Sequence, residues 1–94
     1  MDQVTDERLD KYFSITKEAL DMVLDKGVDE SREEDAKDFL DMAERYYRDA
    51  KHFREKGDKV TAFAALNYAH GWLDAGARIG LFKVKDSRLF TVDD

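Results

Sequence analysis

The chain has 94 residues, a length typical of one domain, so we expect a single helical-bundle domain over residues 1–94. It contains no Cys, which excludes disulfides and thiolate metal ligands. Its net charge of −6 arises from interspersed acidic and basic residues, whereas nucleic-acid binders gather Lys and Arg on one face. A nucleic-acid partner is therefore not expected.

The composition also bears on where the protein works. The N-terminus lacks the basic, apolar and small-residue series of a signal peptide. The longest weakly charged stretch, residues 60–82, contains Asp74 and Arg78, and each would cost free energy at the centre of a bilayer. We expect a cytoplasmic protein without a membrane partner. Charged residues make up 40% of the chain, a bias common in heat-adapted proteins, so we also expect thermostability.

The first predicted helix covers residues 6–26. Thr5 is a suitable N-cap, and Asp6 and Glu7 favour the positive end of the helix dipole. Residues expected to face the core recur every three or four positions, which is helical periodicity. They are Leu9, Phe13, Thr16, Leu20 and Val23. Gly27 is expected to end this helix in the left-handed conformation.

Two further helices follow, over residues 32–56 and 59–82. Ser31 and Glu34 have the spacing of a capping box, with Ser31 as the N-cap. Gly57 is expected to end the second helix, and Asp58 to cap the third. Because both connections are short, neighbouring helices should run antiparallel. The sequence predicts an all-α, up-down-up three-helix bundle with an extended C-terminal tail at residues 83–94.

The third helix is predicted to be the centre of the bundle, because small residues share one side of it. This seam comprises Ala62, Ala65, Ala69, Gly76 and Gly80. Small side chains allow two helix backbones to approach closely. Tyr68, Trp72 and Ile79 flank the seam and are candidate interface residues. The apolar arc is wider than two neighbours should cover, so either the tail or a second copy of the protein should shelter the remainder.

A polar line on the opposite side of this helix is the one candidate binding site. It comprises Asn67, His70, Gly71, Asp74 and Arg78. An anion, a carboxylate or the backbone of a partner could approach at Gly71, with Asp74 orienting His70. The alternative is an ordinary solvated face with an ion pair between Asp74 and Arg78.

Few other residues in the sequence are suited to metal binding or catalysis. His70 and Asp74 offer two metal ligands, whereas a zinc site needs three or four, so no metal and no cofactor are expected. The three Ser residues lie in contexts typical of helix surface, cap and tail, and no glycine-rich phosphate loop precedes a helix. No residue is therefore assigned a catalytic role.

Two stretches resemble a known family: Y-Y-R-D-A-K-H-F-R-E-K-G-D at residues 46–58 and A-F-A-A-L-N-Y-A-H-G-W-L-D-A-G-A-R-I-G-L-F at residues 62–82. They are similar to archaeal proteins grouped as domain of unknown function 357, and L-F-T-V at residues 89–92 is similar too. The resemblance implies a small three-helix bundle from a cytoplasmic archaeal protein. It implies no reaction, cofactor or catalytic residue.

Two functional hypotheses follow. The first is a non-catalytic protein-interaction module that self-associates as a homo-oligomer such as a dimer, with Tyr68, Trp72 and Ile79 as anchors. The alternative is an RNA-processing enzyme, because helical nucleotide-binding nucleases place an Arg a few residues before a His. Here Arg48 precedes His52 with three residues between them, fewer than that motif normally has. Such an enzyme could instead be centred on His70, Asp74 and Arg78.

Overall fold

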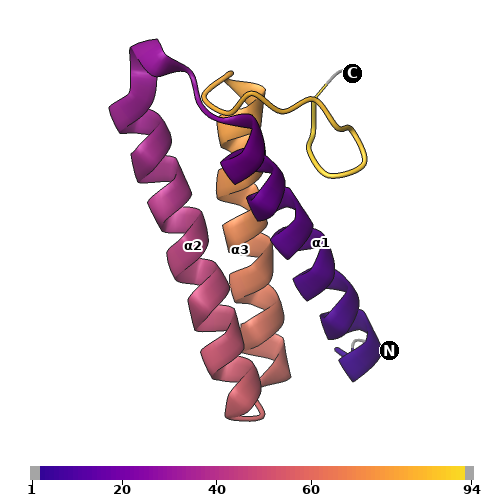
Figure 1. The fold of residues 1–94 in the computed structure, drawn as a ribbon. Coiled ribbons are helices and arrows are strands. Elements are labelled where there is room, and N and C mark those ends of the chain that lie inside the picture. The colour runs from indigo at the N-terminus through magenta and orange to yellow at the C-terminus, as the bar shows by residue number, and fades with distance from the viewer. Residues whose placement is uncertain (1–2, 93–94) are drawn as a thin grey trace.

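In the computed structural model, which describes residues 3–92, three long helices run side by side (Figure 1). α1 spans Asp6–Lys26, α2 spans Glu33–Glu55 and α3 spans Lys59–Arg78, and a short 3₁₀ helix, η1, lies at Glu30–Arg32. Consecutive long helices are antiparallel, and no strand occurs within the described residues. The predicted all-α three-helix bundle is confirmed.

α3 is the central helix of the bundle. It packs closely along α2 and also against α1, whereas the backbones of α1 and α2 lie farther apart and these two helices meet through side chains such as Phe13 and Tyr47 (Figure 1). α3 is also the least charged of the three helices, yet none of the helices in residues 3–92 combines the length and apolar character needed to cross a membrane.

Three predicted helix ends are confirmed by their hydrogen bonds. The Thr5 side chain accepts a hydrogen bond from the backbone N–H of Arg8 at 3.1 Å, and the Asp58 side chain accepts one from Thr61 at 3.0 Å. Gly27 ends α1 with a φ of 87°, a left-handed value that favours glycine. Side-chain oxygens at the first turn satisfy amides that have no partner within the helix.

The predicted capping box at Ser31 is wrong. The capping side chain belongs to Asp29, whose Oδ1 accepts hydrogen bonds from the Ser31 backbone N–H at 3.0 Å and from the Ser31 hydroxyl at 2.7 Å. Arg32 precedes α2 without a side-chain cap. The chain therefore enters α2 through a 3₁₀ turn, in which the Ser31 hydroxyl donates to the Asp29 carboxylate, a charged and therefore strong acceptor.

The predicted end of the third helix is also wrong, because α3 ends at Arg78 and not at residue 82. Gly80 has a φ of 77°, and the N–H of Leu81 donates to the Gly76 carbonyl at 2.8 Å, a typical helix-terminating arrangement. Gly80 is exposed and therefore does not belong to the seam.

The other four seam residues, Ala62, Ala65, Ala69 and Gly76, are buried as predicted. The reason for Gly76 differs from the prediction, however. A Cβ atom at this position would lie 2.2 Å from Cε2 of Phe82, so the ring of Phe82 occupies the space beside Gly76. Phe82 is 2% exposed and lies just after the turn at Gly80.

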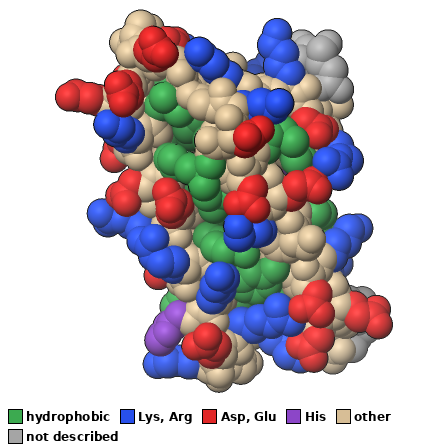
Figure 2. Space-filling model, viewed as in Figure 1, with side chains coloured by type: hydrophobic (Ala, Val, Ile, Leu, Met, Phe, Trp, Pro, Cys, Tyr) green, Lys and Arg blue, Asp and Glu red, His purple; other side chains and the backbone are tan. Residues whose placement is uncertain are grey.

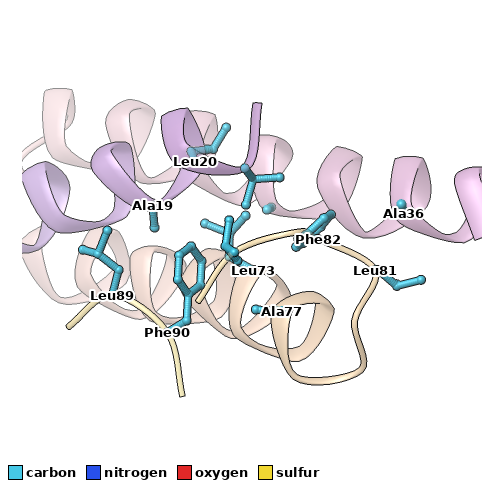
Figure 3. Close-up of a cluster of buried hydrophobic side chains, with 12 residues drawn as sticks. Ala19, Leu20, Ala36, Leu73, Ala77, Leu81, Phe82, Leu89 and Phe90 are labelled. Atoms are coloured by element: carbon cyan, nitrogen blue, oxygen red, sulfur yellow. The ribbon is translucent and has the colours of Figure 1, made fainter. Parts of the chain in front are cut away.

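Residues 83–92, the C-terminal strap, fold back onto α1 and α3 and do not extend away from the bundle. Leu89 and Phe90 are 4% and 3% exposed, and they join Leu73 and Ala77 of α3 and Ala19 of α1 in one buried cluster (Figure 3). The strap is therefore one of the two covers expected for the wide apolar arc of α3.

Candidate functional site

The outward side of α3 is nearly free of charge in a chain where charges are abundant. Of the seven exposed residues of α3, six are uncharged, whereas ten of twelve exposed residues of α1 and eleven of twelve in α2 are charged. Figure 2 shows side chains of both signs over the face on which α1 and α2 lie. The exposed residues of α3 are Val60, Ala64, Asn67, Tyr68, Gly71, Ala75 and Arg78. We call them the outer face of α3.

Helical periodicity explains why these residues lie together. With 3.6 residues per turn, the seven positions fall within an arc of about 100°. His70 and Asp74 lie on the side of this arc that meets the strap, and Trp72 lies on the side that meets α2. The outer face is therefore what remains of α3 after the strap and α2 have covered its sides.

The three candidate interface residues have different surroundings. Tyr68 is 53% exposed, and its ring lies 4.3 Å from that of Tyr46 on α2. Trp72 is half-buried and packs edge-on against Phe39 of α2, with 5.0 Å between ring centroids. Its indole N–H is buried and has no hydrogen-bond partner among residues 3–92, which costs free energy. Ile79 is also 53% exposed but lies beyond the end of α3.

A shallow hollow of about 430 Å³ lies in the middle of the outer face. It is lined by Asn67, Tyr68, Gly71, Trp72 and Ala75. Gly71 forms part of its floor, and a Cβ atom at Gly71 would meet nothing within 4 Å. An interior Gly costs a helix about 1 kcal/mol relative to Ala. Packing within this chain does not explain that cost.

His70 joins the strap to α1. Its Nε2 lies 2.6 Å from the carbonyl oxygen of Leu89, which can only accept, so Nε2 carries the proton and donates. In the neutral ring Nδ1 is then an acceptor, and the hydroxyl of Thr16, 3.4 Å away, donates to it. Thr16 is 1% exposed, so this hydrogen bond satisfies a buried hydroxyl.

Asp74 holds the next residues of the strap. Its carboxylate accepts hydrogen bonds from the backbone N–H of Thr91 and from the Thr91 hydroxyl, the latter at 2.6 Å. The predicted polar line therefore divides into two parts. His70 and Asp74 bind the strap, whereas Asn67, Gly71 and Arg78 stay on the outer face.

The other residues considered for metal binding or catalysis lie apart from one another. Within residues 3–92, no group of three or more His, Asp or Glu side chains lies close enough together to hold a metal ion. Arg48 and His52, the pair considered for a nuclease, are both exposed on α2, and His52 packs edge-on against Phe53. Arg48 lines a small hollow between α1 and α2, of which His52 is not part.

A family model described as protein of unknown function, DUF357, matches residues 11–82. The chain belongs to the DUF357 family. No curated protein and no solved structure matches it. In this DUF357 chain the matched stretch ends at Phe82, so it includes the whole of α3, whereas the likeness expected at residues 89–92 lies outside it.

Sequence reasoning missed the strap partners of His70 and Asp74 in this DUF357 protein. The sequence did contain a signal for the contact between His70 and α1, because Thr16 is a polar residue at a position that helical periodicity places in the core. A buried hydroxyl needs a partner, and the third helix offered His70. Nothing in the spacing indicated that Leu89 and Thr91 would supply the other partners.

Proposed function

We propose that this protein is a non-catalytic interaction module that self-associates through the outer face of α3. The single observation that carries the proposal is the near absence of charge on this exposed face, in a chain whose other exposed helical residues are mostly charged. An uncharged, partly apolar patch with a charged surround is the usual composition of a protein–protein contact.

A second copy of the chain is the occupant that the face fits best. Two-fold dimers use the same patch on both subunits, so a suitable face must carry both a protruding group and a recess for it. The outer face has both, because the exposed ring of Tyr68 stands beside the hollow at Gly71. In a dimer, Tyr68 of each copy enters the hollow of the other, and aromatic anchors of this kind dominate binding energy.

Gly71 supports the same arrangement. Its missing side chain costs helix stability and relieves no contact within the chain. On a dimer surface the same absence allows two helices to approach at the short end of the usual 8–10 Å range. Ala64 and Ala75, which are also small and exposed, extend this close approach along the helix.

The alternative, an RNA-processing enzyme, has less support. Both ring nitrogens of His70 already take part in hydrogen bonds within the chain, so neither is free for proton transfer. Arg48 and His52 remain exposed on α2, and the hollow that Arg48 lines does not include His52. RNA cleavage by the purified protein, lost on His52→Ala, would favour the enzyme instead.

The proposal is tested by measuring mass in solution with light scattering. We expect a dimer for the wild type and a folded monomer for Gly71→Arg, because the Cβ atom of the new side chain would meet nothing within 4 Å in the monomer and the side chain would fill the contact surface. Asp38→Arg is the matched control, since Asp38 is exposed on α2 and is not one of the residues of the outer face of α3. It should remain a dimer.

A wild type that stays monomeric at high protein concentration contradicts self-association. The outer face would then be the contact surface for a different protein and not for a second copy of this chain. Circular dichroism of Gly71→Arg should show unchanged helix content, which separates loss of association from loss of folding.

A further inference from the structure

A hollow lined by four cations lies at the end of the bundle where α1 and α3 both finish. Its volume is about 910 Å³, and its lining includes Lys26, Arg78, Lys83 and Lys85 but no acidic residue among those described. These are four of the 16 Lys and Arg residues in a chain with a net charge of −6. The hollow is therefore locally basic in an acidic protein.

The fold holds these cations together from distant parts of the sequence. The N–H of Lys83 donates to the carbonyl of Gly27 at 3.0 Å, and Val28 pairs with Phe82 in an isolated antiparallel bridge. The strap therefore begins beside the end of α1, which places Lys83 next to the residue that follows Lys26. Like charges held side by side destabilise a fold.

The charges of this hollow are poorly balanced within the chain. Among residues 3–92, Arg78, Lys83 and Lys85 make no ion pair, and Lys26 reaches only Asp25 at 4.0 Å on the exposed surface. Nearby Arg32 and Arg88 differ, because Arg32 pairs with Asp29 at 2.8 Å and Arg88 with Glu18 at 2.7 Å. Unpaired cations such as Lys11 and Lys56 also occur elsewhere on the described surface, but at this hollow Arg78, Lys83 and Lys85 line one recess together.

Helix dipoles account for the positions of only two of the four cations that line the hollow. Lys26 and Arg78 lie in the last turns of α1 and α3, where a positive charge is favourable. Lys83 and Lys85 lie in the strap and have no such role. Between them, Val84 is 4% exposed and anchors this part of the strap in the core, which fixes the position of its two neighbours.

We propose that this basic hollow binds a small anion that carries phosphate groups. Lys side chains bind phosphate as point charges, and Arg78 adds a planar group suited to paired phosphate oxygens. The apolar residues of the lining, Phe82 and Val84 among them, give room for an uncharged part of the ligand. The site uses residues other than those of the proposed dimer contact, apart from Arg78 at its edge.

The test is calorimetric titration of the full chain with pyrophosphate and with ATP. The variant Lys83→Ala/Lys85→Ala should bind about tenfold more weakly or worse, because it loses charge-assisted hydrogen bonds. Lys11→Ala/Lys56→Ala is the matched control, since it removes the same charge from exposed residues outside the hollow. It should bind as the wild type does, and binding should weaken as salt is raised.

A second arm distinguishes free phosphate compounds from lipid headgroups. Cosedimentation with vesicles of phosphatidylglycerol, compared with phosphatidylcholine alone, detects the lipid source. Binding in either arm that is lost in Lys83→Ala/Lys85→Ala and kept in the control supports the site. Absence of binding in both arms, or equal loss in the two variants, overturns it. Thermal melts should show neither variant to be less stable than the wild type, because all four lysines are exposed and removing two of the clustered charges relieves repulsion.

Discussion

The ring of Phe82 occupies the space in which any side chain at position 76 would lie. A Cβ atom built on Gly76 would be 2.2 Å from Cε2 and 2.5 Å from Cδ2 of that ring. The glycine inside α3 is therefore explained by the return of the chain after α3, and not by the approach of another helix. It allows the polypeptide to leave α3 at Gly80 and still bury Phe82 in the core.

Gly76→Ala should destabilise the protein even though Ala is the better helix former. Phe82 is 2% exposed and has little room to move, so the added methyl group creates overpacking that typically costs about 1–3 kcal/mol. Urea denaturation monitored by circular dichroism measures the change in the free energy of unfolding.

Gly71→Ala is the control for this substitution. It makes the same chemical change in the same helix, where the new methyl group meets nothing within 4 Å. We expect the monomer to gain about 1 kcal/mol. Equal shifts in the two variants would show that Phe82 does not enforce Gly76.

His70→Ala should loosen the C-terminal strap more than it destabilises the whole bundle. The variant loses the hydrogen bonds to Leu89 and Thr16, each with a net value of about 0.5–1.5 kcal/mol. Hydrogen exchange should become faster at the amides of Phe90 and Val92, while the amides in the middle of α2 keep their protection. Asn67→Ala, an exposed change on the same helix, should leave the strap unaffected. Unchanged exchange in His70→Ala would contradict the role of His70 in fastening the strap.

The melting temperature at acidic pH should depend on whether Asp29 is ionised. Hydrogen bonds from Ser31 and Arg32 lower the pKa of Asp29 from 3.8 to about 2. Because the folded state favours the carboxylate, its contribution is present above the ordinary pKa and is lost as the pH falls toward 2. The melting temperature of Asp29→Asn should therefore fall less than that of the wild type between pH 4 and pH 2. Identical slopes for the two proteins would count against this network.

Much of the fold could be predicted because its signals are local. Thr5 and Asp58 cap helices through hydrogen bonds to residues three positions away, and Gly27 ends α1 through its own backbone conformation. The end of α3 was not predictable from apolar periodicity, since Leu81 and Phe82 continue the pattern while the chain has already turned at Gly80. Both residues are buried through the strap connection instead.

The candidate site was predictable only in part. Helical spacing placed Asn67, Gly71 and Arg78 together, and all three are exposed. The same spacing grouped His70 and Asp74 with them, but their partners lie in α1 and in the strap. Such contacts depend on how distant segments meet, which the periodicity of one helix does not contain.

The most direct test of self-association through the outer face is disulfide cross-linking of single-cysteine variants. Because the chain has no native Cys, each introduced thiol is unique. A thiol cross-links to its symmetry mate only where the two Cα atoms lie about 4.4–6.8 Å apart, so Cys is introduced singly at Ala64, Gly71 and Ala75 along the outer face. At least one of these variants should give a covalent dimer under mild oxidation, whereas Asp38→Cys, which is exposed on α2, should remain a monomer. Equal cross-linking of Asp38→Cys, or none with any of the three outer-face variants, would contradict self-association through this face.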